Sequence, residues 1–259
     1  MEKWQKPLDK FLSEWKDRPY VLGAILTGSR ATTHYSERSD FDVYIILSDS
    51  IRWRERGNKV IDGLLFEYFA NPAKQIRTYF KKEFSDYDRL TSTMFVTGKV
   101  IFDRTGAVRR LVREAQRWLD KDFPKQGRQQ REQDKYAVSD LLDGLRDLHD
   151  HGSKGFEFLY YHTLKRTFDG YAKFLRVEPP STNESKMVKI LEDADFRRQY
   201  KIREFPDRIF VRLFLRCLEK KTDAERMDSI DMLAKHVLNK MGGFDIDGWK
   251  LRSKLDLNN

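Results

Sequence analysis

The sequence predicts an α+β protein, with an N-terminal sheet domain over residues 1–122 and a C-terminal α-helical bundle over residues 123–259. Short apolar segments rich in β-branched and aromatic residues recur up to residue 103, whereas only helical periodicity is found from residue 134 onward. A polar stretch that contains Pro124 and Gly127 lies between these two regions and is typical of a linker. Because strands and helices are segregated along the chain, an α+β architecture is expected.

The elements of the first half follow from periodicity and turn residues. Apolar side chains at helical spacing predict a helix over residues 4–16, which Pro19 ends. Apolar runs predict strands over residues 20–26, 40–47, 64–69 and 98–103. Turns at 57–58 and 62–63 are expected around a further strand region. Asn71 and Pro72 predict a helix with Pro72 in its first position, and another helix is expected from about Gly106.

The second half shows helical patterning throughout, separated by short turns. The predicted helices cover residues 134–150, 155–176, 184–194, 206–220 and 222–241. Cys217 is the only cysteine, so an internal disulfide is excluded, and its place in an apolar helical run predicts a buried thiol. The N-terminal residues lack the apolar core of a signal peptide, and the apolar run over 20–26 is too short to cross a bilayer. A cytoplasmic protein without a membrane partner is therefore expected.

The chain is basic, with 50 Lys and Arg residues against 41 Asp and Glu residues and a net charge of +9. Such a balance favours anionic partners such as nucleotides or RNA. The excess is spread evenly, since residues 1–120 carry 22 basic and 17 acidic side chains and residues 121–259 carry 28 and 24. Nucleic acid therefore remains a candidate partner but is not favoured, because no basic tail or patch stands out.

Three acidic residues occupy positions where a strand would normally be apolar. Side chains two residues apart point to the same side of a strand, so Asp40 and Asp42 share one face of the strand over 40–47. Two adjacent carboxylates repel each other and resist desolvation, a cost that a divalent cation removes. Glu67 is a third carboxylate, within the otherwise apolar strand over 64–69. Carboxylates on neighbouring strands could hold two Mg²⁺ ions about 3.5–4 Å apart, the arrangement used for in-line phosphoryl displacement.

A glycine-serine pair directly follows the first predicted strand. Gly28 allows the backbone to approach a phosphate closely, and the hydroxyl of Ser29 can donate a hydrogen bond to it. Arg30 can add a charge-assisted contact. The ten residues from Arg30 to Ser39 allow a short helix that returns the chain to the same end of the sheet as Asp40.

Gly28-Ser29, ten residues, and then Asp40-Phe41-Asp42 in a strand resembles the signature of the DNA polymerase β-type nucleotidyltransferase superfamily. Glu67 matches the third acidic position of that superfamily, and the helical second half is similar to that of the bacterial aminoglycoside and lincosamide nucleotidyltransferases. The motifs cover about residues 20–70, and the two-domain layout extends the resemblance loosely over the chain. The resemblance implies a mixed-sheet nucleotidyltransferase fold.

The resemblance also implies a reaction. It implies transfer of NMP, with ATP as the expected donor, to a hydroxyl of a small acceptor such as an aminoglycoside, which would make the protein an antibiotic-resistance enzyme. Two Mg²⁺ ions would bind Asp40 and Asp42, Gly28 and Ser29 would contact the triphosphate, and Glu67 would be either a metal ligand or a general base. Lys186 matches a lysine that relatives often place near the triphosphate. The acceptor would bind between the domains, and homodimers are known among relatives.

Several alternatives stay open. The acceptor can instead be a protein or an RNA end, and the chain can instead be a non-catalytic nucleotide-binding module. Asp140, Asp143 and Asp147 line one side of a predicted helix and would suit a cationic acceptor such as an aminoglycoside, although a solvated helix face is the favoured explanation. A second Asp-x-Asp pair, Asp245 and Asp247, directly follows two glycines and is expected to lie in a C-terminal loop without function.

Overall fold

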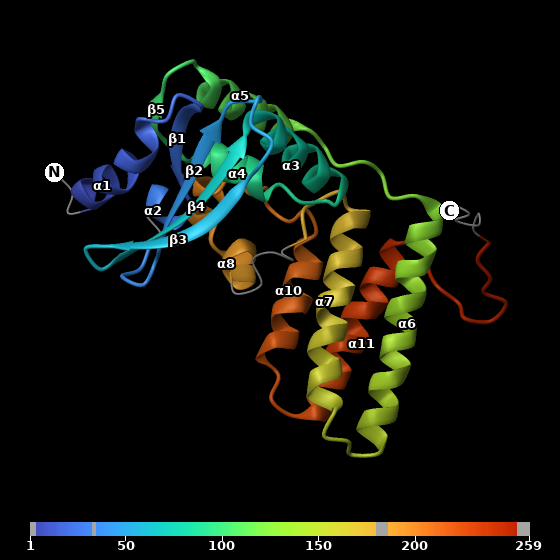
Figure 1. The fold of residues 1–259 in the computed structure, drawn as a ribbon. Helices are drawn as coiled ribbons and strands as arrows, with labels where there is room; N and C mark the ends of the chain where they lie inside the picture. The colour runs from blue at the N-terminus through green and yellow to red at the C-terminus, as the bar shows by residue number, and fades with distance from the viewer. Residues whose placement is uncertain (1–3, 33–34, 180–185, 253–259) are drawn as a thin grey trace. The chain divides into compact units, whose positions relative to one another are not determined.

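The fold is taken from a computed structural model that describes residues 4–32, 35–179 and 186–252 (Figure 1). The chain forms two compact units, Met1–Asp122 with Ala194–Ile202, and Phe123–Asp193 with Arg203–Asn259. A five-stranded mixed sheet lies in the first unit and helices make up the second, which confirms the α+β prediction. Residues 194–202 belong to the first unit although they follow the predicted boundary at residue 122.

The first unit is built on β1 (Val21–Thr27), β2 (Phe41–Leu47), β3 (Glu55–Ile61), β4 (Leu64–Pro72) and β5 (Lys99–Asp103), in the spatial order β3-β4-β2-β1-β5. β2 and β4 are parallel, and the other neighbouring pairs are antiparallel. The helices of this unit are α1 (Gln5–Lys16), α2 (Gly28–Ala31), α3 (Ala73–Ser85), α4 (Leu90–Thr97), α5 (Ala107–Asp120) and α9 (Ala194–Gln199).

Two apolar cores cover the two faces of the sheet. β2 contributes side chains to both cores, because successive residues of a strand point to opposite faces. Val43 and Ile45 belong to the core that contains Phe11 of α1. Tyr44 and Ile46 point to the opposite face and belong to the core formed with α3, α4 and α5. Asp42 lies on this second face, two residues before Tyr44, where it is partly exposed.

The second unit contains α6 (Arg128–Asp150), α7 (Phe156–Phe174), α8 (Met187–Glu192), α10 (Arg208–Glu219) and α11 (Asp223–Lys240). Cys217 is buried in its core, as predicted, and burial raises the pKa of this thiol to about 11. Its carbonyl oxygen accepts a hydrogen bond of 2.8 Å from the hydroxyl of Tyr160. In the described part of the chain, the helices are either too short or too polar to cross a membrane.

Some predicted boundaries are wrong, for local reasons. Gly57 and Asn58 lie inside β3 instead of in a turn, because Gly57 faces Tyr68 across the strand pair and a Cβ there would lie 2.6 Å from its hydroxyl oxygen. Pro72 precedes α3 instead of occupying its first turn. α6 starts at Arg128, six residues before the predicted start at residue 134. Its first turn is exposed, so it contains good helix formers but no apolar residues at helical spacing.

α4 and α9 have no counterpart among the helices predicted from the sequence. The helix predicted over 184–194 is confirmed in its described part as α8, while residues 184 and 185 lie outside the described residues. Asp245 and Asp247 lie in a loop after α11, as predicted.

Candidate active site

Asp40, Asp42 and Glu67 come together at one end of the sheet. Asp42 of β2 is the direct cross-strand partner of Glu67 on the parallel strand β4, and Asp40 immediately precedes β2. Each of the three side chains offers a carboxylate oxygen, and these oxygens lie within 4.8 Å of one another. All three residues are partly buried. The sequence therefore identified three carboxylates that the fold does bring together.

The donor set suits a hard divalent cation. Mg²⁺ binds oxygen ligands at about 2.0–2.1 Å, so two ligands on opposite sides of one ion are roughly 4 Å apart. The 4.8 Å limit on the separations of the carboxylate oxygens is close to that span and also fits ligands shared between two ions about 3.5–4 Å apart. Small side-chain rotations would therefore be enough to bind a metal at this cluster.

Gly28 lies against the cluster at the end of β1. Its φ of +69° is in the left-handed region, and a Cβ at this position would lie 1.9 Å from Oδ2 of Asp42. Thr27, the preceding residue, is the cross-strand partner of Asp42 in β1. Glycine is therefore required here both by the backbone conformation and by the close approach of the carboxylate. This contact connects the Gly28-Ser29 turn directly to the carboxylates.

Arg30 holds the segment that leads into Asp40. Its Nε donates a hydrogen bond of 3.0 Å to the carbonyl oxygen of Ser39, and its guanidinium lies 4.8 Å from the ring centre of Phe41. A further bond of 3.4 Å runs from Nη2 to the carbonyl oxygen of Glu37. Arg30 thus fixes the residues on either side of Asp40, which is a role that its position in the sequence did not suggest. Its contact with a phosphate remains a prediction.

Arg56, on β3, is a site residue that the sequence did not reveal. Its Nε donates a hydrogen bond of 2.9 Å to Oε1 of Glu67, and its Nη2 forms an ion pair with the same oxygen. This hydrogen bond raises the pKa of the Arg56 guanidinium. The Arg56 side chain is 70% exposed and that of Glu67 only 18%, so Arg56 can release Glu67 when Glu67 binds a cation.

The other predicted residues lie in the second unit. Lys186 directly precedes α8, and its contact with a nucleotide remains a prediction. Two residues of the acidic stripe on α6 have basic side chains as partners: Arg146 donates a hydrogen bond of 2.7 Å to Asp143, and the imidazole of His151 lies 3.4 Å from the Asp147 carboxylate. These contacts favour the interpretation of the stripe as a solvated helix face.

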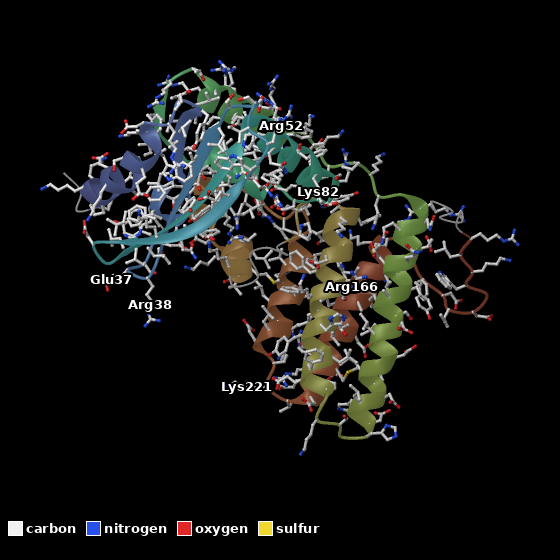
Figure 2. The ribbon with its side chains drawn as sticks, in the orientation of Figure 1. Glu37, Arg38, Arg52, Lys82, Arg166 and Lys221 are labelled. Carbon is white, nitrogen blue, oxygen red and sulfur yellow. The ribbon has the colours of Figure 1, made fainter. Side chains whose placement is uncertain are left out.

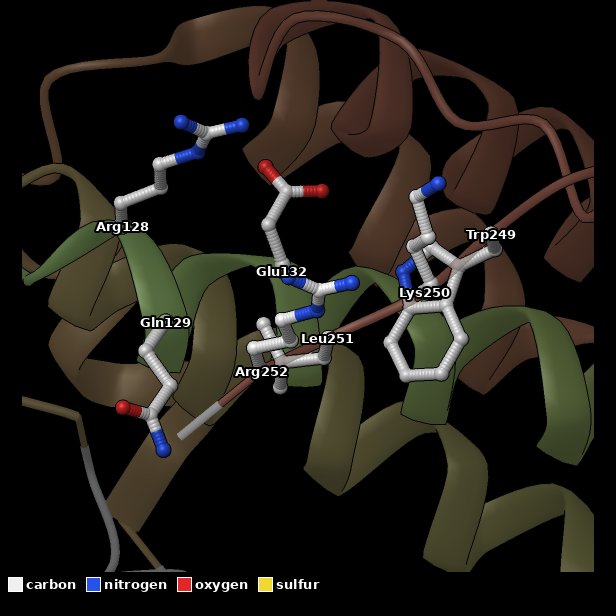
Figure 3. A pocket seen from close by; sticks show the side chains of 7 residues that line it. All are labelled: Arg128, Gln129, Glu132, Trp249, Lys250, Leu251 and Arg252. Atoms are coloured by element: carbon white, nitrogen blue, oxygen red, sulfur yellow. The ribbon is translucent and has the colours of Figure 1, made fainter. Parts of the chain in front are cut away.

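The second unit also has a cavity of about 610 Å³ beside α6 (Figure 3). It is lined by basic side chains, Glu132 and Trp249, whose indole stacks on Tyr136 with 4.4 Å between ring centres. The residues that line it include none of the predicted site residues. Charged side chains lie over both units (Figure 2), and the acidic cluster of the first unit is the candidate for catalysis because its three carboxylates can share a cation.

Comparisons with known proteins add a similarity of fold. Neither the models of known protein families nor the curated proteins contain a match to this chain. Among solved structures, the chain is similar to the crystal structure of a nucleotidyltransferase-like protein from Exiguobacterium sibiricum. The TM-score is 0.48 and the sequence identity 14%, over 91% of this chain and 74% of that chain. Nothing in these comparisons supports a role in antibiotic resistance.

Proposed function

We propose that the protein is a metal-dependent nucleotidyltransferase that transfers AMP from ATP to a hydroxyl of a small acceptor and releases pyrophosphate. The observation that carries this proposal is the convergence of Asp40, Asp42 and Glu67 beside a glycine whose backbone touches Asp42. Three hard oxygen donors next to a turn that a phosphate can approach closely form a site suited to a metal–nucleotide complex.

The site residues have different roles according to their place on the sheet. Gly28 and Ser29, at the end of β1, bind the triphosphate, and Asp40 and Asp42 hold the cation beside it. Glu67 completes the ligand set, because its carboxylate lies in the same cluster as the two aspartates. The bound Mg²⁺ ions would neutralise charge on the attacking and leaving oxygens. Arg30 holds the segment before Asp40 through its bonds to the carbonyl oxygens of Ser39 and Glu37.

The bond changes follow from in-line displacement. The acceptor oxygen attacks the α-phosphorus of ATP and forms a new O–P bond, while the bond from that phosphorus to the bridging oxygen of pyrophosphate breaks. The proton of the acceptor hydroxyl passes to solvent water. The site needs no covalent intermediate on the protein, so catalysis consists of positioning and charge stabilisation.

Transfer of label from α-labelled ATP with Mg²⁺ across a panel of hydroxylated acceptors tests this proposal. Asp40→Asn and Asp42→Asn are expected to abolish transfer, since each removes a metal ligand. Asp245→Asn and Asp247→Asn are matched controls, because they alter an Asp-x-Asp pair in an exposed loop. Equal transfer by the Asp40 and Asp42 variants would refute the site, and ATP binding without transfer to any acceptor would support a non-catalytic nucleotide-binding module.

A further inference from the structure

A cavity of about 430 Å³ lies in the first unit, on the same face of the sheet as the carboxylates. Tyr44 lines it and follows Asp42 by two residues on β2, and Phe69 lines it and follows Glu67 by two residues on β4. Strand alternation therefore places both aromatic side chains on the face of the carboxylates. The cavity and the acidic cluster are consecutive parts of one surface.

The wall of the cavity combines aromatic rings with guanidinium groups. The rings of Tyr44 and Phe69 stack with their centres 4.9 Å apart, and the guanidinium of Arg56 lies 5.0 Å from the ring centre of Phe69. Arg54 lies two residues before Arg56, and its Nη1 donates a hydrogen bond of 2.7 Å to the hydroxyl of Tyr79 on α3. That bond uses one of five guanidinium N–H groups and fixes the side chain at the cavity.

The acidic residues at the cavity do not offset these two arginines. Glu55 points to the other face of the sheet, where its carboxylate accepts a hydrogen bond of 2.6 Å from the hydroxyl of Tyr68. Glu83 accepts a hydrogen bond of 2.8 Å from the backbone N–H of Thr91, and burial raises the pKa of Glu83 to about 7. A large share of Glu83 is therefore neutral near pH 7. Arg56 is ion-paired with Glu67 in the absence of a cation, and once a cation binds Glu67 both arginines give the cavity a positive charge.

The order of the strands indicates which substrate binds in this cavity. β1, which ends just before Gly28, lies on one side of β2, and β4 and β3 lie on the other side. If the triphosphate binds at Gly28, pyrophosphate leaves towards β1. In-line displacement requires the attacking oxygen to arrive from the opposite direction, which is the side of Glu67 and of this cavity. This step rests on the proposed nucleotidyltransferase function.

We infer that the cavity binds the acceptor, and that the acceptor is a hydroxylated molecule with an anionic carboxylate or phosphate group, which Arg54 and Arg56 recognise. Guanidinium groups bind such anions through paired N–H donors, and Phe69 provides an apolar surface for the rest of the molecule. A polycationic acceptor such as an aminoglycoside would be repelled by the two arginines. Acceptor choice is thus assigned to Arg56 on the edge strand β3 and to Arg54 just before it, instead of to the acidic stripe on α6.

Two pairs of probes that differ in charge test this inference by calorimetry: 4-hydroxybenzoate with 4-hydroxybenzamide, and glycerol 3-phosphate with glycerol. The full chain is first loaded with Mn²⁺ and α,β-methylene ATP, an analogue that cannot release pyrophosphate. We expect at least one anionic probe to bind about tenfold or more tightly than its neutral partner. Arg54→Ala should remove this preference, whereas Arg52→Ala should keep it. Arg52, labelled in Figure 2, is exposed two residues before Arg54 and is not among the residues that line the cavity.

The outcomes separate the two proposals. Binding of the analogue with Mn²⁺ and no preference for the anionic probes would overturn the acceptor assignment alone. A preference that Arg54→Ala leaves unchanged would overturn it as well, since the anion would then bind elsewhere. Failure of the wild-type chain to bind Mn²⁺ with the analogue would instead refute the proposed function on which the assignment rests.

Discussion

Replacing Gly28 with alanine tests the link between the glycine turn and the carboxylates. The added Cβ would lie 1.9 Å from Oδ2 of Asp42, where real contacts are no shorter than 3.0 Å, so the carboxylate must move by about 1 Å. Mg²⁺ and Mn²⁺ sites tolerate only a few tenths of an ångström in ligand distance. Gly28→Ala should therefore take Asp42 out of the ligand set and weaken Mn²⁺ binding about tenfold or more, a loss of roughly 1.4 kcal/mol.

Gly63→Ala is the matched control, because Gly63 also has a positive φ, +78°, but a Cβ there meets nothing within 4 Å. Left-handed backbone costs a non-glycine residue about 1–2 kcal/mol, so both variants should lose that much in the free energy of unfolding. The carboxylate of Asp42 is the end of a partly exposed side chain and can rotate away from the new Cβ, so Gly28→Ala should differ from Gly63→Ala chiefly in metal binding. Urea unfolding and Mn²⁺ titration by electron paramagnetic resonance measure stability and metal binding separately. Wild-type Mn²⁺ affinity in Gly28→Ala would refute the reasoning.

Three further predictions concern single side chains. Because the pKa of Glu83 is raised to about 7, the free energy of unfolding of the wild type should fall as pH rises from about 4.5 through 7. Glu83→Gln should remove that fall, which amounts to up to about 3 kcal/mol in urea unfolding. Identical pH profiles for the two proteins would disprove this prediction. Burial alone would raise the pKa of Asp207, but bonds from Tyr171, Phe210 and His236 lower it to about 2. The stability that ionised Asp207 contributes should therefore be present above pH 4 and lost towards pH 2. Asp207→Ala should lower the free energy of unfolding by about 1–2 kcal/mol at pH 7, because it removes the N-terminal cap of α10. A negligible change would count against this role. Arg56→Gln should tighten Mn²⁺ binding roughly twofold to fivefold, because Glu67 would no longer have to break its ion pair with Arg56 before it binds the metal. Weaker binding would show that Arg56 supports the site.

The sequence was sufficient for the carboxylates because their signal is local. Asp40 and Asp42 stand out as charged positions in an apolar strand, and Glu67 stands out in the same way in the next long strand. Their meeting, however, depends on β2 and β4 being parallel neighbours in a register that pairs Asp42 with Glu67. That pairing is a property of the sheet as a whole, and periodicity within one strand carries no information about it.

The residues that were missed act through tertiary contacts. Arg56 and Arg54 are exposed side chains on or beside an edge strand, and an exposed arginine in a basic chain carries no signal in the sequence. Glu83 is distinguished by burial against Thr91, which depends on α4, a helix with almost no amphipathic pattern. The turn predicted at Gly57 is wrong because the constraint that requires glycine there, the hydroxyl of Tyr68, comes from the neighbouring strand.

Mn²⁺ titration of the wild-type chain and of Asp42→Asn, followed by electron paramagnetic resonance, tests the acidic cluster most directly. The cluster geometry predicts that wild type binds Mn²⁺, that Asp42→Asn loses this binding, and that Asp247→Asn, in the C-terminal loop, binds as wild type does. Equal Mn²⁺ binding by all three proteins would contradict a metal site at Asp40, Asp42 and Glu67, and the proposed transfer reaction would then lose its basis.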